Sequence, residues 1–138
     1  MEITKVGVAG CGLMGHGITQ VSAEAGYDVV VTESSQDRLD AGINKITKQL
    51  GRAVEKGKIE QSAADEILGR IHPTLDLNDF ADCDLVIEAI TENQPLKNET
   101  FARLDAICPP HALLASNTSS CNVTAIAAST QHQERVLG

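Results

Sequence analysis

The chain has 138 residues, close to the commonest size of one domain, and 42% of them are apolar, enough to bury a core. Its 19 acidic and 11 basic residues give a net charge of −8, which disfavours binding to nucleic acid or to anionic membranes. With two Phe, one Tyr and no Trp it has no platform for stacking bases, and no apolar run approaches the roughly 20 residues that span a bilayer.

The N-terminus lacks the basic and apolar regions of a secretory signal, so a cytoplasmic protein with reduced thiols is expected. The four cysteines are scattered and form no C-x-x-C pair. No two histidines have metal-ligand spacing either, and we expect no metal site.

Strand-like and helix-like segments alternate along the first half of the chain. Residues 5–9 form a short β-branched run that reads as a buried strand, and residues 15–26 have helical spacing. A second buried strand follows at 28–32. Ser34 is the expected N-cap of a long helix that reaches about Gly57, with Asp37 completing a capping box.

The same alternation continues to the C-terminus. A helix at 61–68 precedes a short strand at 71–75, and the apolar run 84–90 is the next buried strand. A helix from Pro95 to about 107, a strand at 112–115 and a short helix at 122–128 follow, and Val136-Leu137 would begin one more strand. This order predicts one α/β domain over residues 1–138, a Rossmann-type doubly wound fold with a mainly parallel sheet.

The first strand runs into a glycine-rich turn with the pattern G-x-G-x-x-G, read as Gly10-Cys11-Gly12-Leu13-Met14-Gly15. Gly10 permits a tight turn, Gly12 lets the backbone approach a pyrophosphate, and Gly15 allows close packing of helix on strand. The free N–H groups and the positive end of the following helix then face the anion. This turn predicts a dinucleotide site, although a purely conformational turn remains the alternative.

Glu33 ends the second strand eighteen positions after Gly15, where a ribose-binding carboxylate is expected. Such a carboxylate accepts the ribose hydroxyls and repels a 2′-phosphate, so NAD is predicted over NADP. Arg38 lies too far along the chain to replace it cleanly and is interpreted as a solvated residue of the helix.

Two acidic residues and a lysine follow the strand-like run that ends near residue 90. Glu88 interrupts apolar residues and is interpreted as a buried, hydrogen-bonded carboxylate. Glu92 lies at the strand's carboxyl end, where ligands of open parallel sheets bind, or is a loop residue beside a helix N-terminus. Lys97 is placed to reach a cofactor or is solvated in the first helical turn.

Two further features have both a functional and a structural interpretation. The segment Ser116-Asn117-Thr118-Ser119-Ser120 is either an ordinary polar turn or the source of a substrate-orienting hydroxyl. A basic track comprises five of the eleven basic residues and is either a solvated face or a site for a phosphorylated substrate arm: Lys45, Lys48, Arg52, Lys56 and Lys58.

The sequence resembles the NAD-binding domain of L-3-hydroxyacyl-CoA dehydrogenases, including the 3-hydroxybutyryl-CoA enzymes, over essentially its whole length. The matching segments are 10–18, 86–93 and 116–120, in order and at family-like separations. The resemblance implies NAD over Gly10 to Gly15, Glu33 on the adenosine ribose, and Glu92 and Lys97 at cofactor-contacting positions. It also implies that Ser119 holds the substrate oxygen near the nicotinamide and that Lys56 contacts CoA.

The resemblance implies a full protein that is a homodimer and transfers a hydride between an L-3-hydroxyacyl-CoA and NAD. The family's catalytic histidine belongs to a segment that would follow Gly138, and none of the chain's four histidines matches it. The family's helical C-terminal domain is not in this sequence either. We therefore expect the chain to bind NAD but to oxidise hydroxyacyl-CoA poorly or not at all.

Two other interpretations stay open at this point. One is a 3-hydroxyacid dehydrogenase of the 6-phosphogluconate type, whose glycine turn also contains Leu-Met-Gly. Glu33 and the segment 116–120 argue against it. The other is a non-catalytic module that senses NAD or serves as a scaffold.

Overall fold

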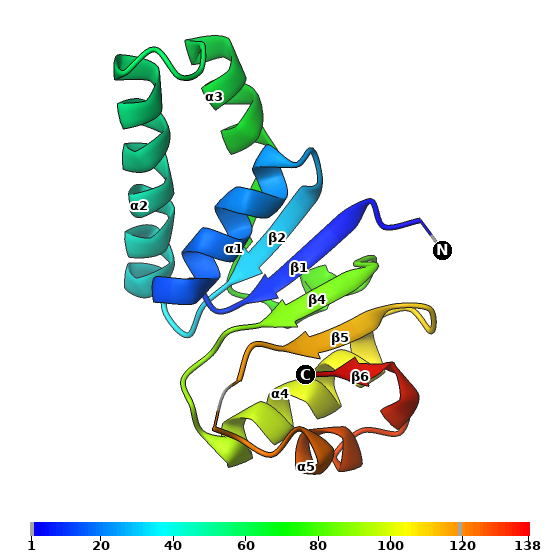
Figure 1. Ribbon diagram of the computed structural model, residues 1–138. Helices are drawn as coiled ribbons and strands as arrows, with labels where there is room; N and C mark the ends of the chain where they lie inside the picture. Colours follow the sequence, from blue (N-terminus) through cyan, green and yellow to red (C-terminus); the bar gives the residue numbers. More distant parts are fainter. Residues whose placement is uncertain (1, 119) are drawn as a thin grey trace.

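Six parallel strands form a single sheet in the computed structural model, which describes residues 2–118 and 120–138 (Figure 1). Their spatial order is β3-β2-β1-β4-β5-β6. The strands are β1 Lys5–Ala9, β2 Asp28–Thr32, β3 Ile71–Thr74, β4 Leu85–Glu88, β5 Leu113–Ser116 and β6 Val136–Leu137. The order changes direction between β1 and β4, which is the point where a doubly wound sheet opens a crevice at its carboxyl edge.

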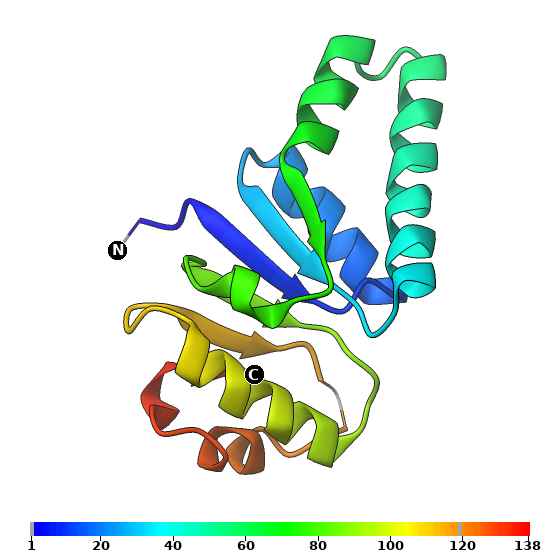
Figure 2. The same cartoon turned by 180° about the vertical axis from the view of Figure 1, so that it is seen from behind.

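Helices cover both faces of this sheet. α1 (Leu13–Glu24), α2 (Gln36–Glu55) and α3 (Gln61–Gly69) lie on one face, with α2 and α3 side by side (Figures 1 and 2). α4 (Gln94–Ile107) and α5 (Val123–Ala128) lie on the other. Two 3₁₀ turns, η1 (Leu77–Phe80) and η2 (Gln133–Arg135), complete the connections.

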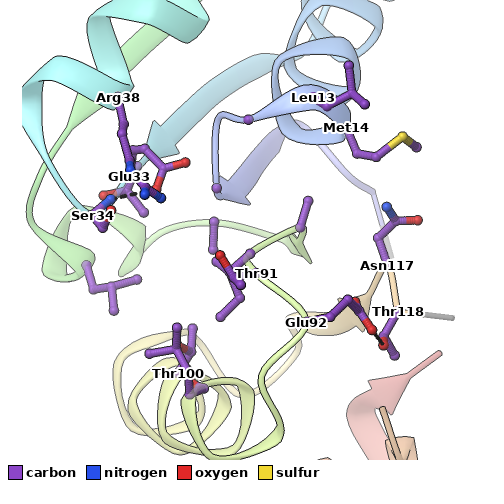
Figure 3. A pocket seen from close by; sticks show the side chains of 18 of the residues that line it. Leu13, Met14, Glu33, Ser34, Arg38, Thr91, Glu92, Thr100, Asn117 and Thr118 are labelled. Atoms are coloured by element: carbon purple, nitrogen blue, oxygen red, sulfur yellow. Dashed lines mark hydrogen bonds between the residues drawn. The ribbon is translucent and has the colours of Figure 1, made fainter. Parts of the chain in front are cut away.

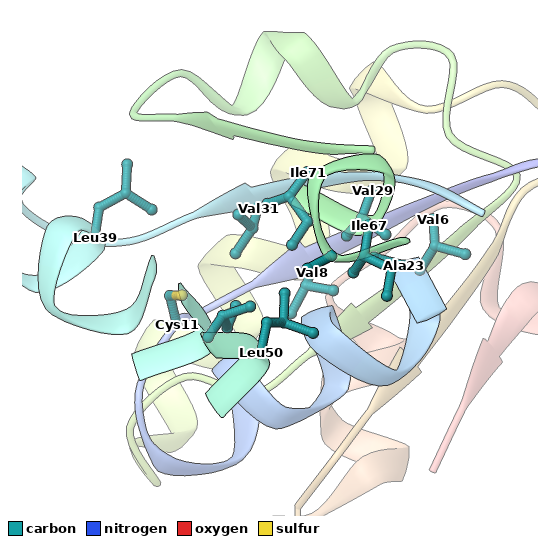
Figure 4. Close-up of a cluster of buried hydrophobic side chains, with 12 residues drawn as sticks. Val6, Val8, Cys11, Ala23, Val29, Val31, Leu39, Leu50, Ile67 and Ile71 are labelled. Atoms are coloured by element: carbon teal, nitrogen blue, oxygen red, sulfur yellow. The ribbon is translucent and has the colours of Figure 1, made fainter. Parts of the chain in front are cut away.

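The core is divided by the sheet because successive strand residues point to opposite faces. Val29 and Val31 of β2 pack in the cluster under α1, α2 and α3 (Figure 4), whereas Val30 packs with Phe80 and Phe101 on the other face. Both faces are buried, so the strands read as continuous apolar runs rather than as alternating ones. The predicted fold class is confirmed.

The boundaries of several elements differ from the sequence-based prediction. Ser35, not Ser34, is the N-cap of α2, and its hydroxyl accepts from the Arg38 N–H at 3.3 Å. The prediction of Ser34 as the N-cap is wrong. Ser34 lies outside the helix, and its backbone N–H donates to Glu33 Oε1. β4 ends at Glu88 instead of Ile90, because Glu88 pairs with Ala9, the last residue of β1.

The strand predicted to begin at Val136-Leu137 is present. β6 pairs in parallel with β5, with Val136 opposite Leu114 and Leu137 opposite Ala115. Among the described residues, no helix has the length and apolar character required to cross a bilayer.

Candidate functional site

A cleft of about 980 Å³ opens at the carboxyl edge of the sheet, where β1 and β4 lie side by side. Its walls come from the turn after β1, the segment after β2, the loops after β3, β4 and β5, and one face of α4 (Figure 3). Most of the predicted site residues line it: Gly10, Gly12, Leu13, Met14, Glu33 and Glu92. The fold therefore brings together residues that are up to 82 positions apart in the sequence.

The three glycines of the turn are explained by different features of the structure. Gly10 has φ +113°, and a Cβ there would lie 2.6 Å from the Ala89 carbonyl oxygen. A Cβ on Gly15 would lie 1.9 Å from the Gly10 carbonyl oxygen, so helix α1 can sit against the turn only with glycine there. A Cβ on Gly12 would meet nothing within 4 Å. Packing within the protein does not require glycine at position 12, and its backbone is open to the cleft.

The N-terminus of α1 offers hydrogen-bond donors to this open space. Gly12 is the N-cap and supplies no side chain, and the first turn contains no acidic residue. The first N–H groups of a helix have no partner within the helix, and its N-terminal end carries a partial positive charge. The turn is thus built to receive an anion, as a pyrophosphate site requires.

The Glu33 carboxylate lies beside the glycine turn and accepts hydrogen bonds from two backbone N–H groups. Its Oε2 accepts from the Cys11 N–H at 2.9 Å, and its Oε1 accepts from the Ser34 N–H at 2.7 Å. The Cys11 side chain points away from the cleft, because a Cβ on Gly42 of α2 would lie 2.3 Å from its sulfur. Burial raises the pKa of the Cys11 thiol to about 11, so the thiol stays protonated in the core.

Glu88 and Lys97 form a buried ion pair behind the cleft. Both side chains are fully buried, and the Lys97 Nζ lies 2.5 Å from Glu88 Oε2. Glu88 Oε2 also accepts from the Ile90 N–H at 2.7 Å, and Glu88 Oε1 from the Ser116 hydroxyl at 2.6 Å. The interpretation of Glu88 as a buried, hydrogen-bonded carboxylate is confirmed. The alternative interpretation of Lys97 as a solvated residue is wrong, because its side chain is enclosed where β4, β5 and α4 meet.

Glu92 links the loops that follow β4 and β5. Its Oε2 accepts hydrogen bonds from the hydroxyls of Thr118, at 2.7 Å, and Ser120, and its Oε1 lies 3.3 Å from Lys97 Nζ. The hydrogen bonds from Ser120 and Thr118 lower the pKa of Glu92 to about 2, which keeps this wall of the cleft anionic. Ser119, the predicted substrate-orienting residue, lies outside the described residues.

Lys56 lies away from the cleft. It is the C-cap of α2 and is exposed, as are Lys45, Lys48 and Arg52 on the same helix, while Leu39, Ile46 and Leu50 are buried on its opposite side. The basic track is therefore an exposed surface, and contact of Lys56 with CoA stays a prediction.

Several lining residues escaped the sequence analysis. Arg38, interpreted as merely solvated, lines the cleft beside Glu33 and Ser34 (Figure 3). Leu75 and Leu77 come from the connection after β3, and Leu96, Thr100 and Arg103 from α4. The last three have i, i+4, i+7 spacing, a signal that they share one helix face.

Known proteins share both the sequence and the fold. The family model described as "3-hydroxyacyl-CoA dehydrogenase, NAD binding domain" matches residues 5–138. The chain belongs to this family. A probable 3-hydroxybutyryl-CoA dehydrogenase of Deinococcus radiodurans is 52% identical over 134 residues, covering 97% of this chain and 48% of that protein. One of Bacillus subtilis is 45% identical over the whole chain and 48% of its own length.

A solved structure agrees. The (S)-3-hydroxybutyryl-CoA dehydrogenase of Ralstonia eutropha superposes with a TM-score of 0.93 at 35% identity, over 98% of this chain and 48% of that one. The chain thus spans about half the length of these relatives. Membership of the 3-hydroxyacyl-CoA dehydrogenase family makes NAD the cofactor of this domain, and it decides against the 6-phosphogluconate type. The open Gly12 backbone, the uncapped α1 and the Glu33 carboxylate fit that dinucleotide.

Proposed function

We propose that this chain is the nucleotide-binding half of a 3-hydroxyacyl-CoA dehydrogenase that acts on 3-hydroxybutyryl-CoA. The observation that carries the proposal is the position of Gly12, where a Cβ would meet no protein atom within 4 Å and which lines a cleft together with Glu33 and Glu92. NAD would supply the hydride acceptor of the reaction, and NADH the donor.

The residues of the cleft have separable roles in this proposal. The backbone from Gly10 to Gly15, Cys11, Leu13 and Met14 included, binds the pyrophosphate, and Glu33 accepts hydrogen bonds from the adenosine ribose. Glu92 is half-exposed at the cleft wall and faces the nicotinamide half, while Lys97 supports Glu92 from behind. Direct contact of Lys97 with the cofactor would require its enclosed ammonium to open toward the cleft. By family resemblance Ser119 orients the substrate oxygen.

The proposal also covers the substrate, the oligomeric state and the cellular compartment. An acyl-CoA would place its phosphorylated arm near Lys56, where the exposed basic track offers favourable charge in an otherwise acidic protein. We also propose a homodimeric full protein in the cytoplasm, where the four free cysteines would stay reduced.

A titration of NADH into the chain, followed by calorimetry, tests the cofactor site. Gly12→Val should weaken NADH binding by about tenfold or more, because the new side chain fills the space that the pyrophosphate needs. The fold should survive, since a Cβ at position 12 meets no neighbour. Gly51→Ala, at an exposed position of α2 that does not line the cleft, is the control and should leave NADH affinity unchanged. Equal affinity of the native and Gly12→Val proteins would exclude this site.

The reaction itself is tested by NADH-dependent reduction of acetoacetyl-CoA. The chain alone should bind NADH yet reduce acetoacetyl-CoA slowly or not at all. Extending it with the C-terminal half of a relative should restore reduction. Persistent inactivity of the extended protein, with NADH binding intact, would favour a non-catalytic NAD-binding module instead.

A further inference from the structure

The Glu33 carboxylate and the Arg38 guanidinium lie at the same end of the cleft, the end at which Glu33 is proposed to bind the adenosine ribose. Glu33 and Arg38 both line it, with Ser34 between them in the sequence (Figure 3). Hydrogen bonds fix the backbone next to both residues. Glu33 directly follows β2, which is paired on both edges, and the Arg38 N–H is bonded to the Ser35 cap of α2. Within residues 2–118 and 120–138, the Arg38 guanidinium takes part in none of the ion pairs.

These two side chains have opposite effects on a dinucleotide that carries a 2′-phosphate. A carboxylate at the end of the second strand accepts hydrogen bonds from ribose hydroxyls and repels a phosphate in their place. An arginine beside it does the reverse, because a guanidinium donates paired hydrogen bonds to phosphate oxygens. The chain therefore holds both the group that rejects a 2′-phosphate and a group that binds one.

We propose that Arg38 is a specificity-determining residue, a 2′-phosphate-binding group whose attraction for the phosphate is outweighed by the charge of Glu33. The proposal rests on the proposed NAD site. Preference for NAD over NADP then depends on one carboxylate, and removing that charge without disturbing the turn exposes affinity for NADP. A second consequence is that Arg38 already moderates the rejection of NADP in the native protein.

Glu33→Gln is the variant that isolates the charge. The glutamine side-chain oxygen can still accept from the Cys11 N–H, as Glu33 Oε2 does at 2.9 Å, so the glycine turn keeps its hydrogen bond to residue 33. The hydrogen bond from the Ser34 N–H, which lies outside the turn, is lost, because the glutamine amide NH2 group cannot accept it. Calorimetric titration should give NADPH binding at least about tenfold tighter than in the native protein, the worth of one charge-assisted contact. The same gain should appear for adenosine 2′,5′-bisphosphate but not for AMP, which places it at the 2′-phosphate.

Two double variants decide whether Arg38 is responsible. Glu33→Gln/Arg38→Gln should lose the gain in NADPH affinity. Glu33→Gln/Arg52→Gln should keep it, because Arg52 lies fourteen residues further along α2, roughly 21 Å at 1.5 Å per residue. Both doubles have the same net charge. A gain that survives Arg38→Gln would overturn the proposal, because the loss of the Glu33 charge alone would then account for it. A gain that disappears with Arg52→Gln would overturn it in favour of the basic track.

A single substitution tests the proposal without altering Glu33. Arg38 is exposed, so Arg38→Gln should fold normally, and it should increase the native preference for NADH over NADPH severalfold by weakening NADPH alone. An unchanged preference contradicts the inference. If the native chain binds no NADH at all, the proposed function itself has failed. If it binds NADH but a folded Glu33→Gln variant gains no NADPH, only the role of Arg38 has failed.

Discussion

Lys97 illustrates how much the surroundings of a single residue decide. It lies in the first turn of α4, where lysines are ordinarily solvated, yet its ammonium is enclosed by Glu88, Glu92 and the carbonyl oxygen of Ile90. A buried charge is tolerated only when it is paired and hydrogen-bonded. Glu88 meets that requirement with three donors, from Lys97, Ile90 and Ser116.

Lys97→Met should destabilise the protein by about 3–5 kcal/mol, because it leaves the Glu88 carboxylate buried without a counter-ion. Glu88→Gln/Lys97→Met should be more stable than Lys97→Met alone, since the amide carries no charge. Urea unfolding of the native, single and double variants measures this coupling. A double variant less stable than Lys97→Met would contradict the account of an uncompensated charge.

At the level of elements, the residue at which α2 begins determines where the Glu33 carboxylate lies in the cleft. Because Ser35 is the N-cap, Ser34 stays outside the helix, and its N–H donates to Glu33 Oε1 at 2.7 Å. Arg38 then falls within the first turn and lines the cleft. A helix that began one residue earlier would use Ser34 as its cap and shift each of these side chains.

Ser35→Ala should therefore cost about 1 kcal/mol of unfolding free energy, the usual worth of an N-cap hydroxyl. Ser34→Ala is the matched control, one residue away and also exposed, and should change the stability by no more than about 0.5 kcal/mol. Chemical denaturation distinguishes the two. The reverse ranking would restore Ser34 as the cap.

At the scale of the whole molecule, Asp84 joins three neighbouring strands of the sheet, β1, β4 and β5, at the end opposite the cleft. Its Oδ2 accepts from the backbone N–H groups of Thr4 and Lys5 at 2.9 and 3.1 Å, and its Oδ1 lies 2.7 Å from His111 Nε2. One carboxylate thus joins the segments that begin β1 and β4 to the turn before β5. The hydrogen bonds from His111, Thr4 and Lys5 lower the pKa of Asp84 well below its usual range.

A depressed carboxyl pKa makes stability depend on pH in a definite direction. The contribution of Asp84 is complete above its unfolded pKa, about 3.9, and is lost as the pH falls from there toward the lower folded value. Asp84→Asn should lower the melting temperature at pH 7, and the gap to the native protein should narrow below about pH 4.

Thermal unfolding of both proteins between pH 7 and pH 3 measures this gap. Asp82→Asn is the control, because Asp82 is exposed and its ion pair with Lys5 lies at the surface, so its removal should change stability little at any pH. A gap between the native and Asp84→Asn proteins that stays constant across the range would mean that the Asp84 ties contribute no pH-dependent stability.

The sequence by itself determined the fold class, the order of the main elements and the glycine turn with Glu33. These are local features: β-branched runs, helical spacing and a G-x-G-x-x-G pattern depend on neighbouring residues in the chain. The resemblance to the hydroxyacyl-CoA dehydrogenases rested on the same local segments, and the family comparison confirms it.

Tertiary structure decided which side chains are free to meet a ligand. Arg38 lines the cleft because the strand order brings the segment after β2 beside the turn after β1, and Lys97 is enclosed because β4, β5 and α4 converge on it. Both residues are polar and lie in the first turn of a helix, so local pattern does not distinguish them. Burial and charge pairing depend on contacts between distant segments, and those contacts exist only once the sheet has formed.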